Sequence, residues 1–156
     1  TVRLGYGHGE RAGYGGGNFY RVIVGICKNG QAKAAIFRNQ DENGYCVANY
    51  DDKACFALTK GCKAKIVPFS RKEELDFGAY LKGEMLVIRN EEGKLIELCS
   101  RNDLKIIGDH NVENCLAAAA ICYFAGIDRL EISRGLKLET ARFGNEPVIL
   151  VRLECF

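Results

Sequence analysis

The alternation of apolar, strand-like runs with helical stretches is the feature that most constrains how this chain can fold. The runs Asn18 to Cys27, Tyr45 to Asn49 and Lys63 to Phe69 are rich in β-branched and aromatic residues. Between them, Gln31 to Asn39 and Lys53 to Lys60 are compatible with short helices. Strands that alternate with helices predict a parallel sheet with helices on its faces.

The pattern changes in the second half of the chain. Between Ala79 and Ile107, two apolar runs lie on either side of the polar stretch Asn90 to Gly93, which predicts a β-hairpin. Helical spacing follows over Asn111 to Gly126 and again over Asp128 to Leu138, and Pro147 to Cys155 is typical of a strand. The predicted fold class is therefore α/β, a mostly parallel sheet with flanking helices plus an antiparallel β-hairpin insert.

Length and charge restrict the number of domains and the class of partner. A chain of 156 residues is the size of one domain. Residues 1–17 are rich in glycine and tyrosine without periodicity and predict a flexible arm, so we expect a single α/β domain over 18–156. The formal charge of +2 and the absence of basic runs make a nucleic-acid partner an unfavoured expectation. No apolar run is long enough to cross a bilayer and no charged leader is visible, so we expect no membrane association and a cytoplasmic location.

The eight cysteines are spread along the chain without any C-x-x-C pair. Zinc sites use closely spaced ligands, and only two histidines are present, so we expect no metal site built on these thiols. Cys115 and Cys122 have helical spacing on one apolar face, where cysteine packs as a small hydrophobe. We expect most of the cysteines to be reduced core thiols.

Two asparagines in the first turn of the predicted helix are the strongest candidates for ligand contacts. Asn111 and Asn114 are three residues apart, and their amides both donate and accept hydrogen bonds, as the edge of an adenine requires. Unpaired backbone amides at a helix start also favour acceptor-rich ligands. The alternative for this segment is ordinary helix capping, which we assign to Asp109. His110 is open to either a ligand contact or a packing role.

A second polar group, Asn49, Asp51 and Asp52, follows the strand Tyr45 to Asn49. The carboxyl ends of strands form the ligand-binding edge of open α/β sheets, so these residues could form part of a site. A capped turn explains them equally well. A metal ion held by the two aspartates would need further oxygen ligands, and the sequence identifies none.

Four segments carry a resemblance to a known family. They are Lys33 to Gln40 (KAAIFRNQ), Tyr45 to Asp52 (YCVANYDD), Lys65 to Ser70 (KIVPFS) and Gly108 to Ala118 (GDHNVENCLAA). Their order and spacing resemble the back half of the central, ATP-binding domain of Mur ligases of the D-glutamate-adding type. The resemblance runs from about residue 33 to residue 128 and does not extend to residues 1–32 or 129–156.

The resemblance implies a chain derived from an ATP-dependent amide-bond ligase of peptidoglycan precursor synthesis, with nucleotide and the remaining domains of the parent ligase as partners. Asn111 and Asn114 would face the adenine of ATP, with His110 and Asn49 as further candidates on the nucleotide side. The family also uses Mg²⁺, for which no residues are identified here. Its phosphate loop ends in Gly-Lys-Thr, a sequence that this chain does not contain. We therefore expect a partial ATP site and no activity from this chain alone.

Two other classes of function stay open. The first is a non-catalytic interaction or scaffold module that uses the ligase-like core and its glycine- and tyrosine-rich arm. The second is RNA binding by the arm, whose aromatic residues could stack on bases while its arginines meet phosphates. The aromatic residues concerned are Tyr6, Tyr14, Phe19 and Tyr20. The near-neutral total charge counts against the RNA hypothesis.

Overall fold

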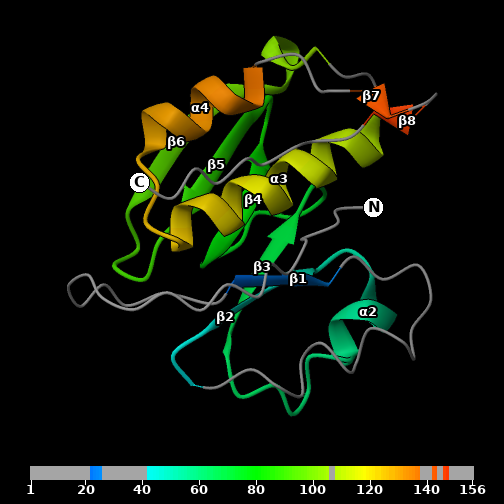
Figure 1. Ribbon diagram of the computed structural model, residues 1–156, viewed down its shortest axis with the longest axis vertical. Coiled ribbons are helices and arrows are strands. Elements are labelled where there is room, and N and C mark those ends of the chain that lie inside the picture. Colours follow the sequence, from blue (N-terminus) through cyan, green and yellow to red (C-terminus); the bar gives the residue numbers. More distant parts are fainter. Residues whose placement is uncertain (1–21, 26–41, 106–107, 138–141, 144–145, 148–156) are drawn as a thin grey trace, which may run out of the picture.

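The structure is a computed structural model that describes residues 22–25, 42–105, 108–137, 142–143 and 146–147 (Figure 1). The predicted arm over residues 1–17, the predicted helix from Gln31 to Asn39 and nearly all of the predicted strand from Pro147 to Cys155 lie outside this part of the chain. Among the described residues, no helix combines the length and the apolar character needed to span a membrane.

Among the described residues, six strands form one sheet in the same order as in the chain. They are β1 (Val22–Gly25), β2 (Tyr45–Asn49), β3 (Lys65–Ser70), β4 (Gly78–Lys82), β5 (Met85–Arg89) and β6 (Leu95–Ser100). The pairs from β1 to β4 are parallel, and those from β4 to β6 are antiparallel. A separate two-stranded antiparallel pair joins β7 (Arg142–Phe143) to β8 (Glu146–Pro147). The predicted α/β class, with a parallel part and an antiparallel hairpin, is confirmed.

The antiparallel part differs in detail from the prediction. The first apolar run contains two strands, β4 and β5, which reverse direction at Gly83, so β4, β5 and β6 extend the main sheet as a meander. β4 pairs in parallel with only the last two residues of β3. This short overlap allows a connection without a helix, although parallel strands that overlap fully need a long crossover.

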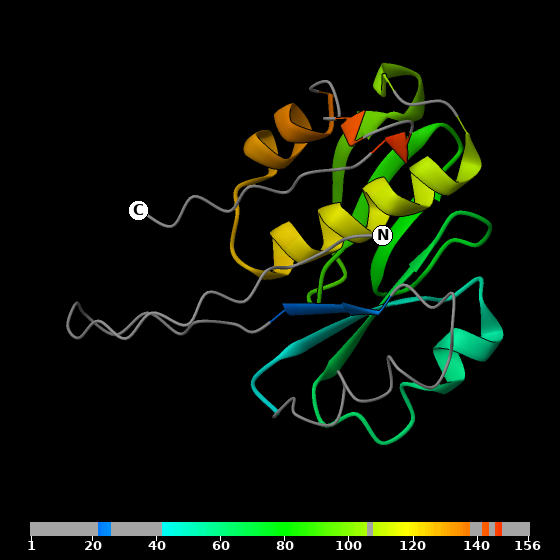
Figure 2. The ribbon, with the colours of Figure 1, turned by 45° about the vertical axis from the view of Figure 1, so that its right-hand side comes forward.

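In the part of the chain that the structure describes, the three α-helices cover the sheet unequally. In the views of Figures 1 and 2, α3 (Asp109–Phe124) and α4 (Arg129–Lys137) lie together on one face, while the short α2 (Lys53–Ala57) lies apart from them beside β2. The main core forms between α3, α4 and the sheet, and it includes Val47, Val67 and Leu116. A smaller cluster around Cys46 and Ala64 forms on the α2 side. β2 is therefore buried on both faces, as expected of an interior parallel strand.

Most residues of helix α3 are buried, and its middle is built from small residues. Ala117, Ala118, Ala119 and Ala120 are all buried. Gly126, at a φ of 88°, follows the helix and accounts for its predicted end. The predicted helices over Asn111 to Gly126 and Asp128 to Leu138 are confirmed as α3 and α4.

The six cysteines that the structure describes are all free thiols, and all except Cys62 are buried. The expected core placement is confirmed for five of these six thiols, since Cys62 is only partly buried, while Cys27 and Cys155 lie outside the described residues. Burial raises the pKa of the Cys115 thiol to about 12 and that of Cys122 to about 11. Burial also raises the pKa of Cys46, with the neighbouring Cys62 adding to the shift.

We predict that these buried thiols react slowly in the native protein. A raised pKa leaves almost no thiolate at pH 8, and the thiolate is the reactive form, so reactivity should appear only as the pH approaches 11. At pH 8, timed alkylation with peptide mapping should modify Cys62 before Cys115 and Cys122, and denaturant should remove the difference. Equal native rates at the three positions would contradict the buried placement.

We also predict that Gly78 tolerates no side chain. Its φ is +109°, and a Cβ at this position would lie 2.1 Å from the carbonyl oxygen of Pro68, a backbone atom that no rotamer change can move. Strain and overlap together should lower the free energy of unfolding of Gly78→Ala by about 3 kcal/mol or more in urea titrations. Gly83→Ala is the matched control, because its φ is +59° but nothing lies within 4 Å. It should cost only about 1 to 2 kcal/mol.

Candidate functional site

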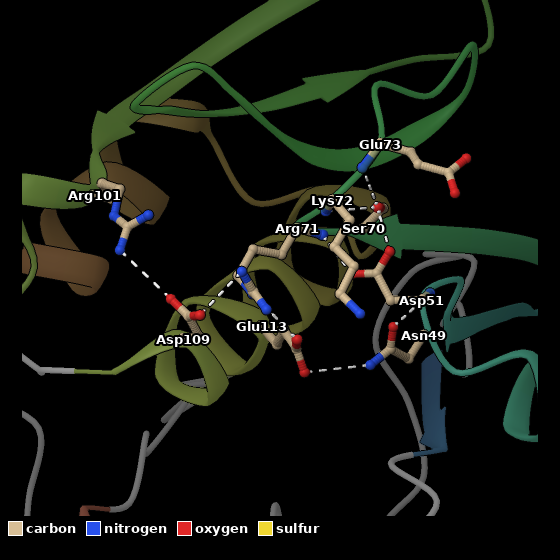
Figure 3. Close-up of polar contacts among 9 residues, drawn as sticks. All are labelled: Asn49, Asp51, Ser70, Arg71, Lys72, Glu73, Arg101, Asp109 and Glu113. Carbon is tan, nitrogen blue, oxygen red and sulfur yellow. Dashed lines mark hydrogen bonds and ion pairs between the residues drawn. The ribbon is translucent and has the colours of Figure 1, made fainter.

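The candidate site lies where the carboxyl ends of β2 and β3 meet the start of α3 (Figure 3). Asn49 ends β2 and Ser70 ends β3, and the two strands are paired in parallel, so the loops that follow them emerge at the same edge. α3 begins at Asp109 over this edge, and its Glu113 reaches Asn49. Because the two strands are parallel, the polar residues at their carboxyl ends gather at this one edge, where open α/β sheets bind ligands.

Asp51 ties the two strand ends together. Its Oδ1 accepts a hydrogen bond of 2.6 Å from the Ser70 hydroxyl, and its Oδ2 accepts one of 2.8 Å from the backbone amide of Arg71. The Ser70 hydroxyl oxygen also accepts from the amides of Lys72 and Glu73, at 3.1 and 2.8 Å. The Ser70 side chain is fully buried, so these bonds satisfy a hydroxyl that water does not reach.

The polar residues at the end of β2 mainly form hydrogen bonds with nearby backbone amides. Asp52 is the N-cap of α2 and accepts from the amide of Cys55 at 3.0 Å, which supports the capped-turn alternative for this residue. Asn49 accepts from the amide of Asp51 at 2.9 Å, while its Nδ2 donates to Glu113 at 3.5 Å. Both carboxyl oxygens of Asp51 accept bonds from protein groups. The described part of the chain holds no group of three or more His, Cys, Asp or Glu side chains placed to bind a metal ion.

Arg71 connects the end of β3 to the first turn of α3. One guanidinium nitrogen, Nη1, lies 3.1 Å from Asp109 Oδ2, and Nε donates to Glu113 Oε1 at 3.3 Å. Arg101 approaches the other oxygen of Asp109 at 3.6 Å and Glu84 at 3.5 Å. Figure 3 shows Arg71 lying between the two carboxylates.

The sequence interpretation did not identify Arg71 or Glu113. The available signal was the spacing of Asp109 and Glu113, which puts two carboxylates four residues apart on one face of the first helical turns. Such a pair at a helix start complements the helix dipole but is self-repulsive. A nearby cation was therefore to be expected, although its position in the chain was not.

The assignment of Asp109 as a helix cap is wrong. The N-cap of α3 is Gly108, which has a φ of 110° and a ψ of 147° and makes no side-chain capping bond. A Cβ at Gly108 would lie 3.1 Å from the ring of His110, and its backbone conformation is one that only glycine adopts readily. Asp109 is instead the first helical residue, and its carboxylate pairs with Arg71 and Arg101.

The predicted ligand contacts differ in accessibility. Asn111 is buried, with 3% of its surface exposed, whereas Asn114 is partly exposed and His110 is exposed. The structure places Asn49 beside the same first turns of α3 through its contact with Glu113. The four candidates therefore lie on the end of β2 and on the first turns of α3, with His110 exposed, Asn114 partly exposed and Asn111 buried.

A cavity of about 570 Å³ among the described residues lies elsewhere. It is lined by the β5–β6 turn and the end of α3, including Tyr45, Asn90, Lys94, Tyr123 and Arg129. None of the predicted site residues lines it. Because Tyr45 begins β2, the cavity lies at the opposite end of the parallel strands from the candidate site.

We predict that Asp51 is required for stability at this edge. Asp51→Ala would remove two hydrogen bonds and leave the buried Ser70 hydroxyl without its acceptor, which should lower the free energy of unfolding by about 1 to 3 kcal/mol. Asp103→Ala is the control, because Asp103 forms an ion pair with Lys137 in which both side chains are about half exposed. It should cost under about 1 kcal/mol. Equal losses in urea titrations would contradict the assigned role.

Comparison with known proteins identifies the family. The sequence model of the Mur ligase middle domain matches residues 28–122. UDP-N-acetylmuramoylalanine--D-glutamate ligase of Caldanaerobacter subterraneus is 44% identical over 96 residues, which cover 62% of this chain and 20% of that protein. The ligase of the same name from Clostridioides difficile is 40% identical over 98 residues, 63% of this chain and 21% of that protein.

Two further comparisons differ in extent. The ligase of the same name from Alkaliphilus metalliredigens is 34% identical over 124 residues, 80% of this chain and 26% of that protein, so similarity extends beyond the segment from residue 33 to residue 128. A solved structure of UDP-N-acetylmuramoylalanyl-D-glutamyl-2,6-diaminopimelate--D-alanyl-D-alanyl ligase from Acinetobacter baumannii gives a TM-score of 0.45 at 21% identity, over 69% of this chain and 24% of that chain. The chain spans about a fifth to a quarter of the length of these curated relatives. Since the middle-domain match covers more than half of its residues, the chain belongs to the Mur ligase middle domain family.

Proposed function

We propose that this chain contributes the adenine side of the nucleotide site in an ATP-dependent amide-bond ligase of peptidoglycan precursor synthesis. The observation that carries the proposal is the partly exposed Asn114 on the first turns of α3, at the carboxyl edge of a parallel sheet, in a chain of the Mur ligase middle domain family. D-glutamate ligases are the relatives that support the reaction class. ATP supplies the energy for amide formation in such a ligase.

The residues present fit the base of a nucleotide better than its phosphates. The first turns of α3 carry the carboxylates of Asp109 and Glu113, which already complement the positive end of the helix and are paired with Arg71. A triphosphate placed there would meet like charge. An uncharged adenine requires only donors and acceptors, which the amide of Asn114 provides.

The two asparagines take different parts in this proposal. Asn114 is accessible and would contact the base directly, while the buried Asn111 would support the turn beneath it. His110 is exposed one residue before Asn111 and would border the base. Asn49 would act through Glu113, which it contacts at 3.5 Å, rather than on the ligand itself.

We predict weak binding of adenosine with little preference for ATP, because the carboxylates of Asp109 and Glu113 at the start of α3 would repel the phosphates. Affinity on the order of 1 mM corresponds to about 4 kcal/mol of binding free energy, a reasonable value for a base held by a few polar contacts. Asn114→Ala should weaken adenosine binding at least about tenfold, the equivalent of about 1.4 kcal/mol. Isothermal calorimetry on the whole chain measures both ligands.

A matched control separates a lost contact from a lost fold. Asn102→Ala removes an exposed amide at the 3₁₀ turn η1 (Arg101–Asp103) and should leave adenosine affinity unchanged. Both variants should keep wild-type stability within about 0.5 kcal/mol, because partly exposed surface amides contribute little. Unchanged adenosine binding in Asn114→Ala would refute the assignment.

The other classes of function give different outcomes in the same experiment. No heat from adenosine or ATP would refute the nucleotide proposal and favour a non-catalytic interaction module. The arm that carries the RNA-binding hypothesis lies outside the described residues. Salt-dependent retention of the chain on single-stranded RNA, with no adenosine binding, would favour that hypothesis instead.

A further inference from the structure

We propose that Arg71 is a positioning residue for the adenine-side site, in that its guanidinium holds the first turn of α3 in the orientation that presents Asn114. The inference rests on the proposed function. The Arg71 side chain contacts the carboxylates of Asp109 and Glu113. It acts through the helix that carries the proposed ligand residues, because it bridges Asp109 and Glu113, the residues that precede Asn111 and Asn114 in the chain.

The Arg71–Glu113 half of the bridge differs from an ordinary surface ion pair in its burial, while the Asp109 side chain is 58% exposed. The Arg71 side chain is 21% exposed and that of Glu113 is 26% exposed, whereas Lys53 and Glu73, which approach to 3.9 Å, are 66% and 57% exposed. Charges that are partly removed from water interact more strongly and are screened less by salt. A planar guanidinium can also serve two carboxylates at once, which the single ammonium of lysine does less well.

The bridge is anchored at its other end as well. The backbone amide of Arg71 donates to Asp51, whose second oxygen is bonded to the buried Ser70 hydroxyl. The position of Arg71 is therefore set by the paired ends of β2 and β3 (Figure 3). Since Arg71 then holds two carboxylates four residues apart on α3, it restricts both the tilt and the rotation of the first turn relative to the sheet.

The N-terminus of α3 needs this support because it has no side-chain cap. Gly108 contributes no capping bond, and Asp109 and Glu113 repel one another on one helical face. Without a cation between them, the first turn would gain freedom to fray or to rotate. The partly exposed amide of Asn114 would then present its donor and acceptor to an adenine in the required orientation for only part of the time.

The alternative for Arg71 is direct binding of an anionic ligand group. Its guanidinium already faces two carboxylates, at 3.1 and 3.3 Å, so an anion there would have to displace at least one of them. A positioning role needs no such displacement. The two roles also differ in their dependence on ligand charge, because only direct binding predicts a larger loss for ATP than for adenosine.

The test uses Arg71→Gln and Arg71→Lys in the whole chain, with Arg134→Gln as the matched control. Arg134 forms an ion pair with Glu131 at 2.7 Å on α4, with both side chains mostly exposed and away from the site. Calorimetry gives the adenosine affinity of each variant. Amide hydrogen exchange of α3, with α4 as an internal reference, reports the order of the first turn independently of any ligand.

We expect Arg71→Gln to bind adenosine about five- to tenfold more weakly, with a similar loss for ATP, and Arg71→Lys to fall between it and the wild type. Exchange at the start of α3 should become several-fold faster in Arg71→Gln and stay unchanged in α4. Arg134→Gln should match the wild type in both measurements. If Arg71→Gln fails to fold, the intermediate affinity and exchange of Arg71→Lys serve as the test.

Two outcomes would overturn the inference: unchanged adenosine affinity in Arg71→Gln, or a loss confined to ATP, which would indicate direct anion binding. Failure of the proposed function is seen separately, as a wild-type chain that does not bind adenosine. In that case the hydrogen-exchange data alone decide whether Arg71 orders the first turn of α3. Faster exchange at the start of α3 in Arg71→Gln would support its hold on the helix, and unchanged exchange would overturn it.

Discussion

The packing of α3 against the sheet is the interaction on which the rest of the structure depends. The helix contacts both the parallel strands and the antiparallel meander, so it joins the two parts of the sheet into one core. Its run of four alanines is buried in this contact. The same packing fixes where the helix begins, and therefore which residues stand at the carboxyl edge of the sheet.

The chemistry of that edge follows from parallel pairing and from the charge of the helix start. Parallel strands β2 and β3 end side by side, so Asp51 can accept bonds from Ser70 and Arg71 across the two loops. α3 then brings carboxylates to the same place, where a cation neutralises them. Most polar groups at the edge are satisfied by one another, whereas Asn114 is partly exposed and His110 is exposed.

Much of the fold could be predicted because strand and helix periods are local. The strand from Tyr45 to Asn49 and the helix after Gly108 are found within a residue or two of their expected bounds. The division of the first apolar run into β4 and β5 was missed, since the reversal at Gly83 needs only a single glycine. Asp109 was misassigned because aspartate at a helix start is equally typical of a cap and of a partner in an ion pair.

The sequence by itself determined the fold class, the family and the segment that carries the candidate adenine contacts, because periodicity and motif spacing are properties of neighbouring residues. Only the tertiary structure decided which candidates are accessible and what holds them. Asn111 and Asn114 are equivalent amides in the sequence, but packing buries the first and leaves the second partly exposed. Arg71 lies about forty residues from its carboxylate partners. Their contact forms only when the end of β3 and the start of α3 meet, so it cannot be predicted from patterns of neighbouring residues.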